Sequence, residues 1–542
     1  MTTKFNTIVS LIFALLATWA IFAAMPSLRL DGMYPQVDTQ IIYLHFLCGL
    51  MAFYLAIRLM INKYDLKNFN HPLIYIPFFL ALTGVISSIF GRNFNFSLSG
   101  APQIGQGVFW YFDITIMSII FSQITHSKLI RVILFVNITI ITFAVSFFTF
   151  FPYWKGLPIS FYYFTDYLCY YGLLNFILLT TITNNRYLLL SACTVLFFYF
   201  NILENRAAML FWVTTVLTGI IYLIFKFLIK NYKLKKIMDF LFSPGMFIFL
   251  IFFISFLILF SSTYFWSSQY NLSAEIKGTI LDAPVVRGKI IENSLYGLNS
   301  LKSFLLGHGW GVITDLLLEN MNMWQYDELR LGYNFHFHTH NEFVEHLVSL
   351  GLIGGILYLI YTYFIFKAAK HISFTSMLAW LLFFKITCFW FLWIGTLTLH
   401  VVVLSCFIIF KSEKTNFFIS NIKFKVFSLS LFFFFSGIFL FYGASLTLNA
   451  AKVNSKLNYE KIVESFANEN RDVNKCLAFY NDNNRGGFIL DMFLHNYSSY
   501  IFALEPNDIE EKSYQVLYEL QCRANSVIKS NNFTSSLLNT AM

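Results

Sequence analysis

The stretch 244–265, PGMFIFLIFFISFLILFSSTYF, decides the fold class of this 542-residue chain, because it is long, apolar and carries no charge. A helix of about 20 such residues crosses the hydrocarbon core of a membrane. Similar runs recur at 6–24, 40–60, 71–90, 105–123, 129–151, 161–183, 187–204, 207–229, 342–366, 373–393, 396–412 and 424–446. We therefore predict an all-α, polytopic integral membrane protein with about 13 transmembrane helices.

Composition supports this class and excludes an ordinary soluble protein. The chain is 57% hydrophobic and 12% charged, with a mean hydropathy of +0.64, whereas soluble chains are about a quarter charged. The net charge of +9 does not indicate nucleic-acid binding, since Lys and Arg gather in short loops between apolar runs. Residues 1–28 resemble a signal peptide, which we interpret as an uncleaved first helix because many spans follow.

The distribution of basic residues predicts the topology. The basic loops all fall on one side if the N-terminus is cytoplasmic. The polar loop 267–341 and the tail then lie outside, which in a bacterium is the periplasm of the inner membrane. We expect a transmembrane domain over 1–446 and a C-terminal helical segment over 447–542. Cys476 and Cys522 in that segment would face an oxidising compartment, where a disulfide could form.

Histidines alternate at the end of the large loop, in His336-Phe337-His338-Thr339-His340. On an extended segment the three imidazoles would share one face. They could ligate a metal, one of them could act as a general base, or the segment could simply be polar. No Cys and no metalloprotease-like His-Glu-x-x-His accompanies them, so the metal signal is weak.

The residues after His340 have plausible structural roles. Asn341 can cap a helix that starts at Glu342 by accepting from an early backbone N–H. Gly351, Gly354 and Gly355 could allow close packing of helices within the membrane.

Three arginines lie at the predicted outer face. Arg206 stands at the outer end of a span, Arg287 in the large loop, and Arg92 before the Gly-rich segment 100–107. A guanidinium suits phosphate oxygens. Alternatively, Arg206 snorkels to the interface and Arg287 is a solvated loop charge.

Four charged residues fall within predicted spans, where charges are costly and usually functional or paired. They are Asp113, Asp166, Glu345 and Lys385. An acidic group near the outer mouth could bind a sugar hydroxyl, orient a histidine, or neutralise Lys385.

The pattern His340-Asn341, nine residues, Gly351, two residues, Gly354 resembles the motif of the O-antigen ligase and O-antigen polymerase superfamily. The segment 306–311, LGHGWG, resembles the glycine-rich loop that precedes this motif. Asn-Arg-Ala-Ala around Arg206 and Arg-Gly at Arg287 are similar to the family's two arginine elements. The resemblance covers roughly residues 70–410.

This resemblance implies a metal-independent glycosyltransferase without a cofactor. The enzyme would move a glycan from undecaprenyl diphosphate to an acceptor on the periplasmic face. Arg206 and Arg287 would hold the diphosphate, and His340 would activate the acceptor hydroxyl. His338, Asn341, Glu345 and Arg92 would support them.

The expected acceptor follows from one difference between this sequence and the family pattern. No Glu-Tyr-Pro-Leu element lies near His400, which disfavours a protein acceptor and favours an O-antigen ligase that uses lipid A-core in lipopolysaccharide biosynthesis. A protein O-oligosaccharyltransferase or an O-antigen polymerase of the same superfamily stays open. A different class, a lipid-linked glycan flippase, would suit the helix number, although no inverted repeat of broken spans is visible.

Overall fold

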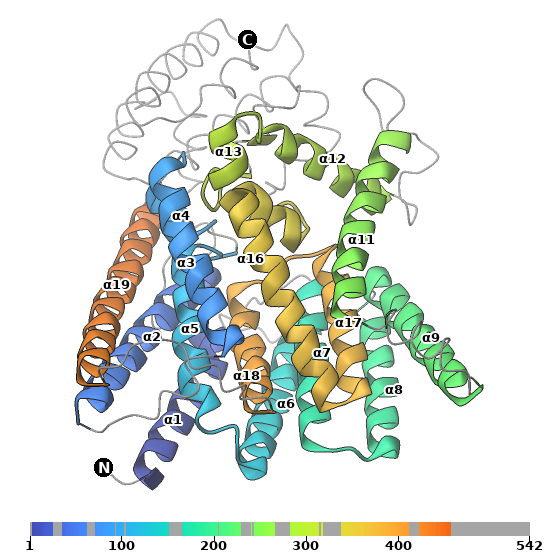
Figure 1. Cartoon of the computed structure of the whole chain (residues 1–542), viewed down its shortest axis with the longest axis horizontal. Helices are drawn as coiled ribbons and strands as arrows, with labels where there is room; N and C mark the ends of the chain where they lie inside the picture. Colours follow the sequence, from blue (N-terminus) through green and yellow to red (C-terminus); the bar gives the residue numbers. More distant parts are fainter. Residues whose placement is uncertain are drawn as a thin grey trace, which may run out of the picture.

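The computed structural model describes residues 3–24, 35–61, 71–92, 94–101, 104–150, 165–203, 205–228, 240, 243–265, 282–313, 316–317, 338–410 and 422–456. These residues form helices and connecting turns, without a strand (Figure 1). The helices are α1 (Thr3–Thr18), η1 (Trp19–Ala24), α2 (Pro35–Ile61), α3 (Pro72–Phe90), α4 (Phe94–Ser99), α5 (Val108–Ser122), α6 (Lys128–Phe150), α7 (Thr165–Ile182), α8 (Arg186–Ile202), α9 (Arg206–Leu228), α11 (Pro244–Phe265), α12 (Asp282–Tyr296), α13 (Leu301–Leu306), α16 (Glu342–Ile372), α17 (Phe374–Thr387), α18 (Ile394–Phe410) and α19 (Ile422–Lys456).

Seven of the described helices are long and apolar enough to cross a membrane, which indicates a membrane-embedded protein. Six shorter apolar helices accompany them. Each of the predicted apolar runs coincides with one of these helices. The predicted boundary at 446 falls inside α19, which continues to Lys456. The predicted loop 267–341 contains α12 and α13, while 457–542, with Cys476 and Cys522, lies outside the described residues.

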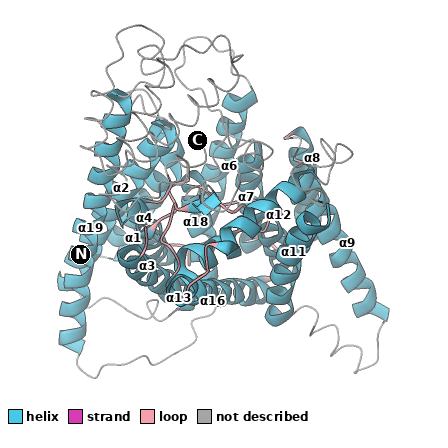
Figure 2. Ribbon diagram, turned by 90° about the horizontal axis from the view of Figure 1, so that it is seen from above, coloured by secondary structure: helices cyan, strands magenta, loops and turns pink. Residues whose placement is uncertain are grey.

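The bundle is built around α5, because every side chain of α5 is buried. Around it pack α2, α3 and α18. At the periphery α9 exposes large apolar side chains such as Leu217 and Leu223, which suits contact with lipid. Seen from above, α9 and α19 lie at opposite edges of the bundle (Figure 2). In α2 and α19, Gly49 and Gly437 let the two backbones approach closely.

The expectation of one continuous span over 342–366 is wrong at Gly351. Gly351 has φ +69° and ψ −168°, which interrupts α16. The rings of His346 and Tyr358 stack with centroids 4.2 Å apart, although residues twelve apart on a straight helix would be separated by about 18 Å. The segment 342–350 is therefore a short arm that folds back along the long arm 352–372. The long arm by itself has the length of a membrane span.

The glycine-rich segment 307–311 holds this turn in place. The backbone N–H of His308 donates to Val348 O at 3.1 Å, and that of Gly309 donates to Ser349 O at 2.9 Å. A Cβ on Gly351 would lie 2.3 Å from the backbone of Leu305. The sequence left close packing as one role for the motif glycines. At Gly351 the structure shows a different role, because the residue forms a turn against the segment 305–307 and needs both the left-handed backbone and the absence of a Cβ.

Candidate active site

The segment 338–341 leads into the short arm of α16, and its last residue, Asn341, caps the start of this helix. Asn341 Oδ1 accepts from the backbone N–H of Val344 at 3.1 Å, so the predicted N-cap is confirmed. Its side-chain nitrogen donates to Ser255 Oγ of α11 at 2.9 Å and to Cys388 O at 3.1 Å. Asn341 is fully buried. It therefore fixes the position of His340 relative to α11 and to the loop 388–393.

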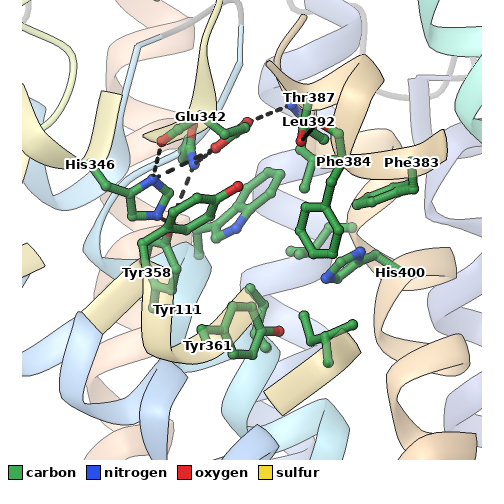
Figure 3. A pocket seen from close by; sticks show the side chains of 15 residues that line it. Tyr111, Glu342, His346, Tyr358, Tyr361, Phe383, Phe384, Thr387, Leu392 and His400 are labelled. Carbon is green, nitrogen blue, oxygen red and sulfur yellow. Dashed lines mark hydrogen bonds and ion pairs between the residues drawn. The ribbon is translucent and has the colours of Figure 1, made fainter. Parts of the chain in front are cut away.

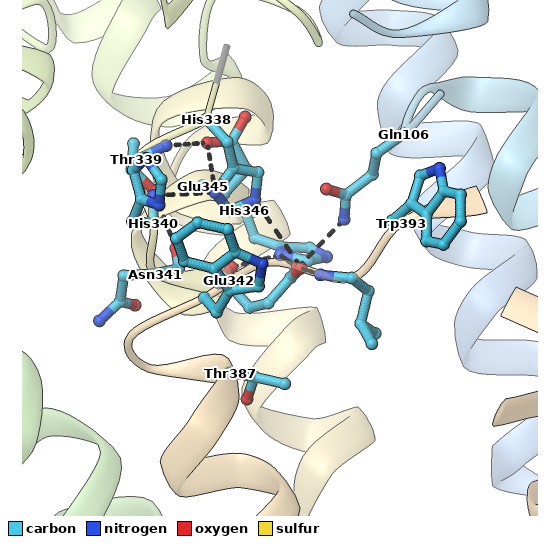
Figure 4. A network of polar contacts seen from close by, with 12 residues as sticks. Gln106, His338, Thr339, His340, Asn341, Glu342, Glu345, His346, Thr387 and Trp393 are labelled. Atoms are coloured by element: carbon cyan, nitrogen blue, oxygen red, sulfur yellow. Dashed lines mark hydrogen bonds and ion pairs between the residues drawn. The ribbon is translucent and has the colours of Figure 1, made fainter. Parts of the chain in front are cut away.

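Glu342, the first residue of α16, ties together three segments that are distant in sequence. Its Oε1 accepts from the backbone N–H of Leu392 at 2.7 Å, and its Oε2 accepts from Gln106 Nε2 at 3.1 Å (Figure 4). Leu392 belongs to the loop 388–393 between α17 and α18, and Gln106 to the Gly-rich segment before α5. The carboxylate is 2% exposed, so these donors replace the water that burial removes.

Glu345 and His338 complete the polar network beside it. Glu345 Oε2 accepts from the backbone N–H of Thr339 at 2.9 Å, and Glu345 Oε1 accepts from Ser349 Oγ at 3.3 Å. His338 lies 3.7 Å from a carboxylate oxygen of both Glu342 and Glu345. Burial, with a smaller effect of nearby His346, lowers the pKa of His338 well below its usual value.

The backbone of His340 is held in a conformation that residues other than glycine rarely adopt. Its φ is +57°, and its N–H donates to His338 Nδ1 at 2.9 Å. The imidazole ring lies 4.9 Å from the Trp390 ring and 5.4 Å from the Phe391 ring, centroid to centroid. Phe389, Trp390 and Phe391 in the loop 388–393 form a surface that we call the aromatic shelf. Trp390 and Phe391 stack at 5.1 Å.

Arg287 reaches the same shelf from α12. Its guanidinium carbon lies 5.2 Å from the centre of the Trp390 ring and 5.8 Å from that of Phe389, distances typical of cation–π contacts. Arg287 and His340 are thus brought together on one indole ring, although 52 positions separate them. Trp390 is only partly buried.

The other two arginines, Arg206 and Arg92, lie at the start of α9 and next to the turn of α16. Arg206 is the first residue of α9, where Asn205 Oδ1 caps the helix by accepting from Ala208 N at 2.8 Å. The Arg206 side chain lies outside what the structure describes, so its predicted role stays a prediction. The start of α9 lies beside the aromatic shelf, since the rings of Phe211 and Phe389 are 4.9 Å apart. Arg92 donates its backbone N–H to His308 O at 3.1 Å, next to the turn of α16.

The charged residues predicted within spans have different partners. Asp113 of α5 binds His45 of α2, with 2.6 Å between Oδ2 and Nδ1 and both side chains fully buried. Asp113 therefore orients a histidine, one of the roles that the sequence left open. Neither Asp113 nor Glu345 neutralises Lys385, which instead donates to the hydroxyls of two α9 threonines. The Asp166 side chain lies outside the described residues.

Behind Glu342 lies a cavity that sequence reasoning missed (Figure 3). Its volume is about 30 Å³, room for one or two water molecules. Tyr361 and His400 both line it, and Tyr361 Oη and His400 Nδ1 have no hydrogen-bond partner among the described residues. The cavity is too small for a sugar ring.

A second group of hydrogen bonds lies along one side of this cavity. Tyr111 Oη binds His346 Nε2, and Gln106 Nε2 donates to Tyr111 Oη at 3.3 Å. His346 Nδ1 donates to the backbone oxygen of Glu342 at 2.5 Å, which fixes the tautomer with the proton on Nδ1. Glu342, Gln106, Tyr111, His346 and Trp390 were not predicted as site residues. Only Glu342 carried a signal, as an acidic residue directly after the motif's His-Asn.

The metal alternative involves His336, His338 and His340. His338 Nδ1 accepts a backbone N–H and is therefore not available as a ligand atom. His336 lies outside the described residues. Within the described part of the chain, no group of three His, Cys, Asp or Glu side chains could hold a metal ion.

Comparison of this chain with protein-family models, with curated proteins and with solved structures finds no match. The resemblance to the O-antigen ligase superfamily therefore rests on the motif residues alone.

Proposed function

We propose that this protein is a membrane glycosyltransferase that moves a glycan from undecaprenyl diphosphate to an acceptor hydroxyl. The observation that carries the proposal is the shared contact of Arg287 and His340 with Trp390. A guanidinium that can neutralise a diphosphate and an imidazole that can take a proton lie against one partly exposed indole. These two groups are what the reaction requires.

Each group has a defined task in the proposed reaction. The acceptor oxygen bonds to the anomeric carbon while the bond from that carbon to the diphosphate oxygen breaks. Arg287, with Arg206 as a second cation, stabilises the negative charge that grows on the leaving diphosphate. His340 removes the proton of the acceptor hydroxyl. We propose that the reaction needs neither a cofactor nor a metal, and a chelator should therefore leave activity intact.

We further propose that the chain crosses the bacterial inner membrane about 13 times and that the site opens to the periplasm. The distribution of basic loops supports this topology. Labelling of single cysteines at Asn320 and Asn532 tests it. Both positions should react from the periplasmic side, and opposite sides would show that the spans around α17 and α18 are miscounted.

The proposed acceptor is lipid A-core, which makes the protein an O-antigen ligase; a protein and a growing glycan are the alternatives. The purified protein would be reconstituted with an undecaprenyl-diphosphate-linked glycan and offered lipid A-core, a pilin-like protein or a second lipid-linked glycan. Transfer to lipid A-core alone is the expected result. Transfer to another acceptor would reassign the subclass, whereas movement of the glycan across the bilayer without transfer would indicate a flippase.

A further inference from the structure

Lys385 is a buried cation that the proposed reaction has not yet used. It lies on α17 and is 8% exposed. Its Nζ donates to Thr214 Oγ1 at 3.2 Å and to Thr215 Oγ1 at 3.1 Å, both on α9. An ammonium group has three N–H donors and no acceptor capacity. Among the described residues, only the two threonine hydroxyls accept from this ammonium, which leaves one donor for another acceptor.

The charge of Lys385 is not balanced within the described part of the chain. The two hydroxyls that it binds are neutral, and the described ion pairs join other residues. A charge among apolar helices costs several kcal/mol when it has no counter-ion, and such residues usually mark a functional site. An anion therefore has a reason to bind here.

Lys385 lies close in sequence to the aromatic shelf. Phe389 lies four residues after Lys385, in the turn that follows the end of α17 at Thr387, where its backbone N–H still donates to Ile386 O at 2.9 Å. Phe389 contacts both Arg287 and Phe211 of α9. The seam between α9 and α17 thus has the Phe211–Phe389 contact at one level and Lys385 with its two threonines at the next.

The α9 side of the seam also carries exposed apolar side chains, which suits contact with lipid. On α9, Leu210, Val213 and Leu217 expose 53%, 39% and 50% of their surface. These positions flank the two threonines in sequence. A ligand with an apolar chain could therefore lie along α9 while its anionic head reaches into the seam.

We infer that Lys385, with Thr214 and Thr215, binds a phosphate group of a polyprenyl diphosphate, one turn deeper than Arg287. The remaining N–H of the ammonium donates to a phosphate oxygen, and the threonine hydroxyls hold the ammonium in place. The identity of the ligand rests on the proposed function. A phospholipid headgroup offers the same phosphate chemistry, and the experiment distinguishes the two sources.

The experiment measures binding without any transfer. The full-length protein in nanodiscs of phosphatidylcholine would be titrated with undecaprenyl diphosphate that carries no glycan. We expect Lys385→Met and Lys385→Gln to weaken binding on the order of 10-fold or more, as for loss of a charge-assisted hydrogen bond. Lys385→Arg keeps the charge and should retain most of the binding. Lys367→Met, which removes a lysine from α16, is the matched control and should bind normally.

Three outcomes would overturn the inference. Equal binding by wild type and Lys385→Met at similar thermal stability would show that Lys385 only packs. If Lys385→Met weakens the binding of phosphatidylglycerol as much as the binding of undecaprenyl diphosphate, the site belongs to phospholipid. Weakened binding in the Lys367→Met control would show a nonspecific charge effect. If no acceptor receives glycan but Lys385→Met still loses undecaprenyl diphosphate, the proposed function fails and the binding site stands.

Discussion

The backbone N–H of His340 donates to Nδ1 of His338 at 2.9 Å. This bond helps to hold His340 at φ +57°, a backbone conformation that is costly for a residue with a Cβ. It requires an unprotonated Nδ1 on His338. The protonation state of one histidine thus controls the placement of the other.

His338 should contribute a loss of stability in acid. Burial, followed by the effect of His346, lowers the pKa of His338 well below its usual 6.5, so the unfolded chain binds a proton at a pH where the folded one does not. The stability that neutral His338 contributes is therefore complete above about pH 6.5 and falls as the pH drops towards the folded pKa. Burial raises the pKa of the neighbouring Glu342 to about 7 and that of Glu345 to about 8, and these two groups act in the opposite direction. The measurement is therefore a comparison of thermal unfolding in detergent: His338→Asn should gain stability relative to wild type as the pH falls from about 7.5 to 5, and a constant difference between the two would contradict this role.

His340 should be needed for chemistry rather than for folding. His340→Gln is expected to express normally and to lose transfer on the order of 100-fold, the usual scale for a positioned acid–base group. His126→Gln, at an exposed turn between α5 and α6, is the matched control. The transfer rates of wild type and both variants would be measured in proteoliposomes, with and without a chelator. Normal transfer by His340→Gln would remove the base role.

Arg287 should act through its fixed fork of donors. Arg287→Ala and Arg206→Ala are expected to abolish most transfer, and Arg287→Lys should restore little, since lysine supplies charge without bidentate geometry. Arg186→Ala at the exposed start of α8 controls for loss of any arginine. Transfer would be compared at matched protein levels in the membrane. Full activity of either alanine variant would exclude that arginine from the diphosphate site.

Trp390 should position both groups. Trp390→Leu removes the ring that Arg287 and His340 share, and we expect a fall in kcat on the order of 10-fold, because small displacements of reacting groups are costly. Trp390→Phe should retain more activity than Trp390→Leu. Trp19→Phe, at an exposed position of η1, should behave as wild type. Initial rates over a range of donor concentrations would decide; a change in KM alone would point to substrate stacking instead.

The turn of α16 should tolerate no side chain at Gly351. Gly351→Ala would place a Cβ 2.3 Å from the Leu305 backbone at a φ of +69°, so a loss of at least about 2 kcal/mol of stability is expected. Gly355→Ala meets Leu347 at 3.3 Å or more and should be mild. Thermal unfolding of both variants would compare them. Equal stability would show that the segment 305–307 can move away from the turn.

The apolar helices were predictable because the signal is local. A run such as 244–265 has no stable position outside an apolar environment, and a helix satisfies its backbone groups without help from other segments. The cap at Asn341 was predictable for the same reason, since its partner Val344 is three residues away. The sequence by itself thus determined the helical class, the positions of the apolar helices and the starting point of α16.

The site depended on contacts between distant segments, which only the tertiary structure decided. The motif glycine Gly351 looked like a packing position within one helix, but its left-handed backbone folds the short arm back against Tyr358. The partners of Glu342 come from the segments before α5 and after α17. A buried polar group takes whichever donors the packed chain places near it, and no local pattern encodes which these are. The meeting of Arg287 and His340 at Trp390 was decided in the same way.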